Sequence, residues 1–364
     1  MSWIATLTIY TGLISAIFLL LFGLWVAFLP WSIRPLMKLM LLPRYSIRFD
    51  GLENIPQSGP VMLVANHVTW IDGFVIASVC RRPITVLVNK DYCDNPGQRW
   101  ISRRMNIIPI PHKGPKAQKV ALELMRKALD DGRTVGMFPE GQLTRSGVMN
   151  PFQRGMEIIL KGKEDVLIVP IGLAGLWGSI FSFSEGRFFK KWPKGLRRKV
   201  GVSFGKPLPY NTKAINVRTI VQQEIVKATS LITEHPTLSD AIDLELGHWR
   251  HPELGLLTAS APDFIQKNRD IHQIGNKPGS VGQALPGVAI RIVNQAGEDL
   301  GFNHLGRIEL QIVPNLNWID SGYSGKIEPD GFLWLENPDD GYLINFRRLV
   351  TRTNGTSVFS DASE

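Results

Sequence analysis

An uncharged apolar segment at the N-terminus constrains this chain more than any other feature. No Asp, Glu, Lys or Arg occurs between Trp3 and Leu29, and the first charged residue is Arg34. A helix of this length reaches about 40 Å, which exceeds the ~30 Å hydrocarbon core of a bilayer. Soluble helices are rarely apolar on every face for so long. The sequence therefore predicts a transmembrane anchor at residues 1–33.

A cleaved signal peptide is the alternative interpretation of this segment. Signal peptides carry a basic region before a shorter apolar core, and no basic residue precedes Trp3. The basic residues follow instead, at Arg34, Lys38, Arg44 and Arg48. Positively charged flanks stay on the cytoplasmic side. We therefore expect a single-pass membrane protein whose remaining chain lies in the cytoplasm.

Charge divides the rest of the chain. Residues 1–244 hold 31 basic and 17 acidic residues, a net +14, and residues 245–364 hold 10 and 15, a net −5. This asymmetry indicates two modules. A basic module is attracted to nucleic acid or to a phospholipid surface, and the apolar segment favours the membrane. We expect a phospholipid membrane partner and no nucleic acid.

Strand patterns alternate with helical patterns over residues 34–245. Strands are predicted at 60–65, 84–89, 134–138, 166–172 and 199–204, and helices at 70–79, 117–129 and 214–233. Such alternation is typical of an α/β fold, here a layered and largely parallel sheet flanked by helices. Short apolar runs after about Gly279 predict a small antiparallel β-rich subdomain. The β-rich part is placed at 246–350, and a flexible polar tail at 351–364.

A histidine and an aspartate stand where the first predicted strand ends. His67 follows this strand, and Asp72 lies five residues later inside the next helical pattern. A carboxylate on one imidazole nitrogen fixes the tautomer and makes the other nitrogen a better base for an alcohol proton. An Asp at a helix start is also typical of a cap. The two interpretations, catalytic and structural, are both open at this point.

Polar residues also follow the strand at 134–138. The segment from Phe138 to Gly147 offers a carboxylate, hydroxyls and a guanidinium, which suit a polyol and a phosphate. The alternative is an ordinary turn with a solvated Arg. A proline, Pro170, stiffens the exit of the strand at 166–172. The candidates for substrate binding here are Phe138, Pro139, Glu140, Gly141, Thr144, Arg145 and Pro170.

In order and spacing, these segments resemble the phospholipid/glycerol acyltransferase family, which includes lysophosphatidate acyltransferases. The family pattern is Asn-His-x-x-x-x-Asp, then Phe-Pro-Glu-Gly, then a Val/Ile-Pro strand. The matching residues are Asn66, His67, Asp72, Phe138, Pro139, Glu140, Gly141 and Pro170. The resemblance implies that His67 is the general base and Asp72 its orienting partner, both catalytic. It also implies acceptor contacts, among them Asn66 and a basic residue at Arg103 or Arg104.

The function implied by this resemblance is acyl transfer without a metal or other cofactor. A fatty acyl group would move from acyl-acyl-carrier protein or acyl-CoA to the free glycerol hydroxyl of a lysophospholipid. Here Gln142 and Leu143 separate Glu140-Gly141 from Thr144, whereas many lysophosphatidate acyltransferases join these directly. In this respect the chain resembles the acyltransferase half of bifunctional 2-acylglycerophosphoethanolamine acyltransferase/acyl-acyl-carrier-protein synthetases.

Residues 250–345 resemble part of an acyl-adenylate-forming ligase. Ala259 stands where those ligases have a motif Glu, and Tyr323 stands where they have a ribose-binding Asp. The resemblance implies a degenerate ligase fragment at 246–350, dispensable for chemistry and retained for docking or stability. Two alternatives to acyl transfer follow: an ATP-dependent fatty-acid ligase or acyl-acyl-carrier-protein synthetase, and a non-catalytic lipid-binding scaffold.

Overall fold

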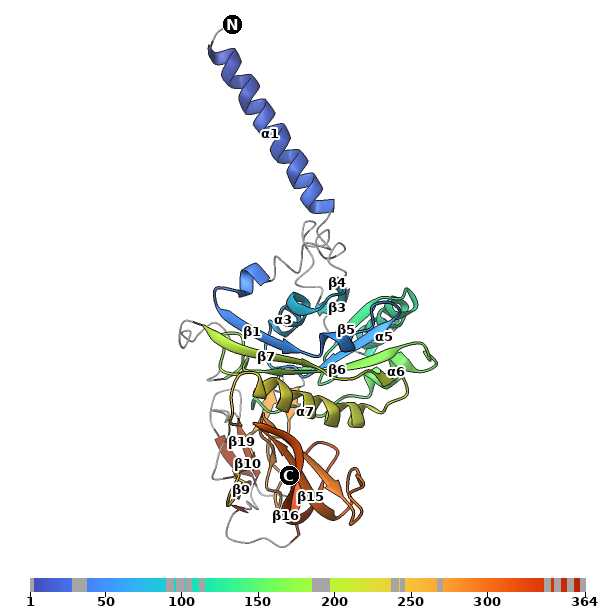
Figure 1. The fold of residues 1–364 in the computed structure, drawn as a ribbon, viewed down its shortest axis with the longest axis vertical. Coiled ribbons are helices and arrows are strands. Elements are labelled where there is room, and N and C mark those ends of the chain that lie inside the picture. The colour runs from blue at the N-terminus through green and yellow to red at the C-terminus, as the bar shows by residue number, and fades with distance from the viewer. Residues whose placement is uncertain are drawn as a thin grey trace.

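The described residues form an N-terminal helix, an α/β unit and a C-terminal β-rich unit (Figure 1). The computed structural model describes residues 3–27, 38–89, 95, 102, 107–110, 115–184, 197–236, 242, 246–266, 271–336, 342–343, 348–351 and 357–360. The helices are α1 (Trp3–Ala27), η1 (Leu52–Asn54), α3 (Asp72–Val79), α5 (Pro115–Asp130), α6 (Gly155–Leu160) and α7 (Ala214–Ser230). The strands of the first unit are β1 (Tyr45–Asp50), β2 (Val61–Ala65), β3 (Ile84–Asn89), β4 (Ile107–Ile110), β5 (Thr134–Met137), β6 (Leu167–Ala174), β7 (Arg198–Phe204) and β8 (Leu208–Pro209).

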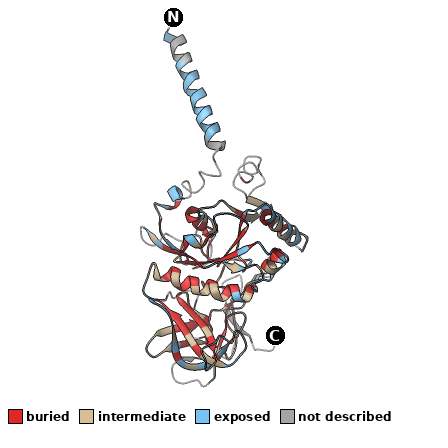
Figure 2. Cartoon of the chain, turned by 45° about the vertical axis from the view of Figure 1, so that its right-hand side comes forward, coloured by how far each residue is buried: buried red, intermediate tan, exposed pale blue. Residues whose placement is uncertain are grey.

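The N-terminal segment is helical, as expected, over α1. The side chains described in it, Trp3 and residues 10–24, are exposed and appear pale blue in Figure 2. Across the part of the chain that the structure describes, no helix combines the length and the hydrophobicity needed to cross a membrane. The expected transmembrane anchor at 1–33 is therefore not confirmed.

One mixed sheet organises the α/β unit. Its strand order is β1-β7-β6-β2-β5-β3-β4, and β8 pairs with β6. The neighbours on this path are parallel except for β6 and β7, and the β6–β8 pair is also antiparallel. The prediction of a largely parallel sheet is confirmed. Strands β2, β5 and β6 are adjacent at its centre, so their carboxyl ends meet at one edge.

Helices cover both faces of this sheet. Leu63 in β2 packs in a core with Val75 of α3. Its neighbour Met62 points to the opposite face, where it joins a core with residues of α5, α6 and α7. Alternate strand residues point to opposite faces, and both faces of β2 are buried. The continuous apolar sequence of this strand follows from burial on both sides.

Helix α7 lies between the two units and is buried on opposite sides (Figures 1 and 2). It approaches the sheet closely because β6 and β7 carry glycines where it crosses. A Cβ atom at Gly172 would lie 2.1 Å from the Glu224 backbone, and one at Gly201 would lie 1.9 Å from the Ala228 carbonyl oxygen. On its other side Val226 packs with Ala289 and Val313 of the C-terminal unit. Both units therefore pack against α7, from opposite sides.

The strands of the C-terminal unit are β9 (His248–His251), β10 (Gly255–Ala259), β11 (Asp263–Gln266), β12 (Ile271–Gln273), β13 (Gln283–Ala284), β14 (Val288–Val293), β15 (Gly306–Ile312), β16 (Asn315–Ile327), β17 (Leu333–Leu335), β18 (Tyr342–Leu343), β19 (Arg348–Thr351) and β20 (Ser357–Ser360). Among the described residues they form three four-stranded sheets, with the orders β13-β10-β9-β18, β12-β11-β19-β20 and β14-β15-β16-β17. The antiparallel β-rich prediction holds except for the β11–β19 pair, which is parallel. Strand structure begins at His248 rather than near Gly279. Four residues of the predicted flexible tail form β20.

Candidate active site

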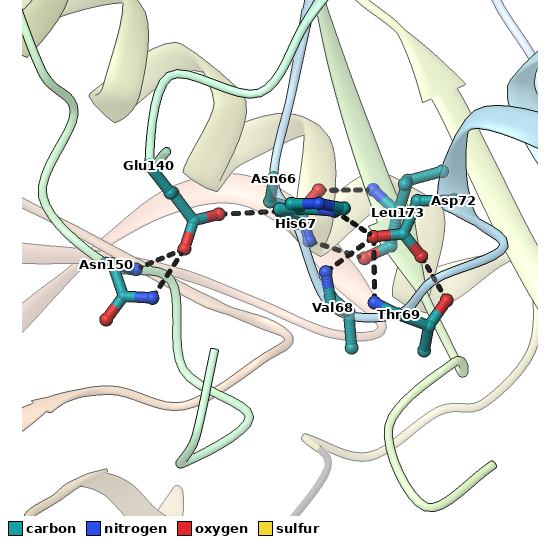
Figure 3. A network of polar contacts seen from close by, with 8 residues as sticks. All are labelled: Asn66, His67, Val68, Thr69, Asp72, Glu140, Asn150 and Leu173. Carbon is teal, nitrogen blue, oxygen red and sulfur yellow. Dashed lines mark hydrogen bonds and ion pairs between the residues drawn. The ribbon is translucent and has the colours of Figure 1, made fainter. Parts of the chain in front are cut away.

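The candidate active site lies where the parallel central strands end. His67 follows β2 by two residues, and Glu140 follows β5 by three. Because β2 pairs in parallel with both β5 and β6, the segments that leave these strands come together. Ligands of open α/β sheets bind outside the carboxyl ends of the strands. Figure 3 shows the polar contacts that result.

His67 and Asp72 form a direct pair. The distance from His67 Nδ1 to Asp72 Oδ2 is 2.9 Å. The aspartate side chain is fully buried and that of the histidine is 23% exposed. A carboxylate at Nδ1 places the proton there and leaves Nε2 as the basic nitrogen. The five-residue spacing thus produces the contact that a general base needs.

Asp72 also stabilises the turn between β2 and α3. Its Oδ2 accepts hydrogen bonds from the backbone N–H groups of Val68 at 2.6 Å and Thr69 at 2.9 Å, and its Oδ1 accepts one from the Thr69 hydroxyl. These donors stabilise an ionised carboxylate in a buried position. The structural and catalytic interpretations of Asp72 are therefore compatible. The hydrogen bonds by which Asp72 closes the turn also hold its carboxylate beside His67.

The imidazole of His67 is held in place by ring stacking as well as by the carboxylate of Asp72. The rings of His67 and Phe138 lie 4.1 Å apart between centroids, with an interplanar angle of 13°. Phe138 comes from the end of β5, the neighbour of β2 in the sheet. An apolar ring on one face leaves the imidazole edge as its reactive part. Phe138, expected to contact substrate, lies against the base.

Glu140 is a buried carboxyl group beside the histidine. Its Oε1 accepts a 2.6 Å hydrogen bond from the backbone N–H of His67, and its Oε2 accepts two from Asn150, at 2.8 Å from the backbone and 2.9 Å from the side chain. Burial raises the pKa of Glu140 to about 7, although these donors lower it. Glu140 therefore binds the backbone of the site and ties the loop that follows it to His67.

This raised pKa predicts a pH-dependent stability. Between pH 4.5 and about 7 the unfolded chain loses the Glu140 proton while the folded chain keeps it. The quantity to compare is the free energy of unfolding of the wild type minus that of a Glu140→Gln variant, and this difference should be highest below pH 4.5. It should fall by about 3 kcal/mol as the pH rises to 7. Urea unfolding of both proteins across this range measures the difference, and parallel pH profiles would contradict the assignment.

Other predicted residues hold the framework of the site. Asn66 bridges β2 to β6, because its side chain donates to the Leu173 carbonyl at 3.1 Å and accepts from the Leu173 N–H at 2.8 Å. Pro170 lies within β6, opposite Val64. Gly141 has a φ of 69°, a left-handed conformation that glycine adopts without strain. These three residues shape the strand ends around His67.

The loop after Glu140 places Thr144 and Arg145 differently from each other. The Thr144 hydroxyl donates to the Val148 carbonyl at 2.6 Å and accepts from the Gly147 N–H at 3.1 Å, which closes a turn. The Arg145 guanidinium lies between two phenyl rings, 3.1 Å from the centroid of Phe183 and 4.2 Å from that of Phe264. Phe264 belongs to the C-terminal unit, so Arg145 takes part in the contact between units.

A cavity of about 90 Å³ opens beside these groups. Its lining includes His67, Glu140 and Thr144 of the first unit and Ala284 and Pro286 of the C-terminal unit. Both units therefore border the candidate site. Two sequence-based assignments cannot be placed: Arg103 and Arg104 lie outside the described residues.

Sequence reasoning missed three residues of this region. Asn150 binds Glu140, Gln273 binds the loop that precedes Asn150, and Arg218 of α7 donates to the Asn150 carbonyl at 3.2 Å. Arg218 is buried, and burial lowers its pKa to about 10, so it is a cation at neutral pH. Polar residues on a helix that is buried on both sides are the one signal that could have drawn attention to Arg218.

Comparisons with known proteins find similarity to acyltransferases. Residues 46–174 match the model of the Acyltransferase family. A chloroplastic 1-acyl-sn-glycerol-3-phosphate acyltransferase of Arabidopsis thaliana is 28% identical over 150 residues, which cover 41% of this chain and 42% of the relative. The crystal structure of the 1-acyl-sn-glycerophosphate acyltransferase from Thermotoga maritima is 20% identical, covers 60% of this chain and 92% of that one, and has a TM-score of 0.44. An amide bond synthetase mutant from Marinactinospora thermotolerans is 11% identical, covers 70% of this chain and 41% of that one, and has a TM-score of 0.20.

The match to the Acyltransferase family contains His67, Asp72 and Glu140 and ends with β6. The resemblance expected for this segment is therefore confirmed. The chain spans less than half the length of the Arabidopsis relative. The ligase resemblance of residues 250–345 stays a prediction, because the similarity to the amide bond synthetase is too low to carry an argument.

Proposed function

We propose that this protein is a membrane-attached O-acyltransferase that moves a fatty acyl group from an acyl thioester to the free glycerol hydroxyl of a lysophospholipid. The observation that carries the proposal is the His67–Asp72 pair, with Nδ1 and Oδ2 2.9 Å apart, inside the segment that matches the Acyltransferase family. Glu140 lies beside the pair on the neighbouring strand end.

His67 is the general base of the proposed reaction. Its Nε2 accepts the proton of the acceptor hydroxyl as that oxygen attacks the thioester carbonyl carbon. The tetrahedral intermediate collapses, the C–S bond breaks, and the thiolate takes the proton back from the imidazolium. Asp72 stabilises the imidazolium that forms in between, because its buried carboxylate contacts Nδ1. The ester gained and the thioester lost balance without a further reactant.

The proposed acceptor is a glycerol lipid with a phosphate. The Arabidopsis relative is named as a 1-acyl-sn-glycerol-3-phosphate acyltransferase, which supports lysophosphatidate. The Gln142-Leu143 insertion favours the 2-acylglycerophosphoethanolamine type of acceptor instead. The proposed donor is acyl-acyl-carrier protein or acyl-CoA. Both acceptors and both donors belong in one assay.

A single assay without ATP tests the function. The full chain is purified in detergent and given lysophosphatidate or 2-acylglycerophosphoethanolamine with a labelled acyl thioester. Appearance of label in a diacyl phospholipid supports acyl transfer. A ligase would instead need ATP and free fatty acid, and a lipid-binding scaffold would retain lipid without turnover. No diacyl product with any of the four substrate pairs would refute the proposal.

We also propose that α1 attaches the enzyme to the phospholipid membrane that holds its acceptor, with the rest of the chain on the cytoplasmic side. Leu13, Phe18 and Leu20 are each more than half exposed on this helix. Exposed apolar surface of this extent is stabilised when lipid covers it. Basic residues follow the helix from Arg34 onward, which favours anionic lipid at the cytoplasmic surface.

The attachment predicts a specific extraction behaviour. Full-length protein in cell membranes should resist high salt and alkaline carbonate and should dissolve in detergent, because apolar contact with lipid does not depend on charge. Fractions are measured by immunoblot with tags at each terminus. Release by salt alone, or a mature chain that begins near residue 30, would contradict the prediction.

A further inference from the structure

We propose that the C-terminal unit holds the site loop, defined as residues 140–150, in the conformation that binds the acceptor, and that Gln273 is the positioning residue. This inference rests on the proposed acyl transfer. It concerns a part of the chain outside the segment that matches the Acyltransferase family. It also replaces the expectation that residues 246–350 are dispensable for chemistry.

Gln273 binds the site loop with both ends of its side-chain amide. Its Nε2 donates to the Leu143 carbonyl at 2.8 Å, and its Oε1 accepts from the Arg145 N–H at 2.9 Å. The residue lies in β12 and is buried. Residues 141–150 contain neither helix nor strand. Backbone groups outside helices and strands need other partners. The Thr144 N–H donates to the His67 carbonyl, whereas the Leu143 carbonyl and the Arg145 N–H find their partner in Gln273 of the other unit.

A contact between Arg145 and two aromatic rings also holds the site loop, in addition to the hydrogen bonds of Gln273. The Arg145 guanidinium lies over the ring of Phe264, which is the residue of β11 directly opposite Gln273 of β12. Phe183 of the first unit covers it from another side. Cation–π contact with a desolvated guanidinium is favourable. The middle of the site loop is therefore held between the units by Arg145 as well as by Gln273.

The end of the site loop is tied to the C-terminal unit through α7. Arg218 donates to the carbonyl oxygens of Met149 at 3.0 Å and Asn150 at 3.2 Å, and also to that of Asp330 at 3.2 Å. Asn150 in turn binds Glu140, which binds the backbone of His67. A continuous set of hydrogen bonds thus joins the C-terminal unit to the candidate base.

The expected consequence is a selective loss of acceptor binding. A loop released from two hydrogen bonds spends less time in the binding conformation, and the apparent affinity falls with that population. Loss of one to two net hydrogen bonds corresponds to roughly a 5- to 30-fold change. The His67–Asp72 pair is held by its own turn, so the chemical step should change less than acceptor binding.

The test compares Gln273→Leu with Gln311→Leu in the full-length chain. Gln311 is also a buried glutamine of the C-terminal unit, but its amide donates to the Leu316 carbonyl within its own sheet. In Gln273→Leu the KM for lysophospholipid should rise about tenfold, while kcat and the KM for the acyl thioester stay within about twofold. Gln311→Leu should leave the ratio of the two KM values at the wild-type level.

Hydrogen exchange provides a readout that does not require activity. Peptides from residues 140–150 should exchange faster in Gln273→Leu than in wild type, while peptides from β2 and β6 exchange at the wild-type rate. If Gln273→Leu does not fold, Gln273→Asn, which keeps the amide but shortens its reach, is measured in the same way. Wild-type KM ratios and exchange rates in the folded variant would overturn the inference. An inactive wild-type enzyme would refute the proposed function alone, because the exchange result still decides whether Gln273 holds the loop.

Discussion

Replacement of His67 by alanine should reduce acyl transfer by about 10²- to 10⁴-fold, the usual cost of losing a general base. The reason is its position: its Nδ1 lies 2.9 Å from Asp72 Oδ2, and its side chain is partly exposed, as a base that meets an acceptor hydroxyl must be. The side chain is not part of the hydrophobic core, so the fold should persist. The measurement is the rate of diacyl phospholipid formation, together with thermal unfolding of the same sample.

His235→Ala is a matched control for this experiment. His235 is an exposed histidine of the same unit, beyond the end of α7. Its replacement removes an imidazole without touching the candidate site, and activity should remain at the wild-type level. A folded His67→Ala protein with near-normal turnover would overturn the proposed mechanism.

Asp72→Asn should lower the rate by roughly 100-fold or more while preserving much of the geometry. An asparagine oxygen in the position of Oδ2 can still accept from the Val68 and Thr69 N–H groups, and its NH₂ group can donate to the Thr69 hydroxyl. The change then removes the negative charge that stabilises the imidazolium of His67. The loss of rate reports electrostatic support of the base.

The measurement for this variant is the pH dependence of kcat/KM, which reports the essential base of the free enzyme. Loss of the carboxylate should lower kcat/KM, because the imidazolium that forms on His67 during the reaction is less stabilised. Asp131→Asn is the control, since this exposed carboxylate contacts Arg133 at the surface. An unchanged rate and profile in Asp72→Asn would remove Asp72 from the catalytic machinery.

The sequence predicted the central strands and helices of the α/β unit in the correct order, because the pattern that marks each of them lies within a few consecutive residues. The apolar runs that became β2, β5 and β6 are short and bounded by turn residues, and each strand formed within one or two residues of the expected start. The predicted α3, α5 and α7 also formed. Strands β1 and β4 and helix α6 were not predicted. Strand β1 contains charged residues, β4 contains Pro109, and α6 is shorter than two turns, so none of them shows the uninterrupted apolar run or the helical period that marked the other elements.

The sequence was less informative about the C-terminal unit and the N-terminal segment. It indicated β structure after Gly279 but gave no sign of the strands from His248 onward, which pair across bulges and short loops. Strand pairing depends on partners far apart in the sequence, which composition does not specify. The expected membrane crossing is not confirmed across the described residues, and extraction experiments test the proposed attachment through α1.

By itself, the sequence determined the pairing of His67 with Asp72. The two residues are five positions apart across one strand-to-helix turn, so the geometry follows from local backbone structure. Only the tertiary structure decided what surrounds this pair. The stacking of Phe138, the buried carboxyl of Glu140 and the grip of Gln273 on Leu143, 130 residues away, arise where separate strands and units pack together. Packing of distant segments sets burial, and burial sets both the pKa of a carboxyl group and the need of a loop for a hydrogen-bond partner.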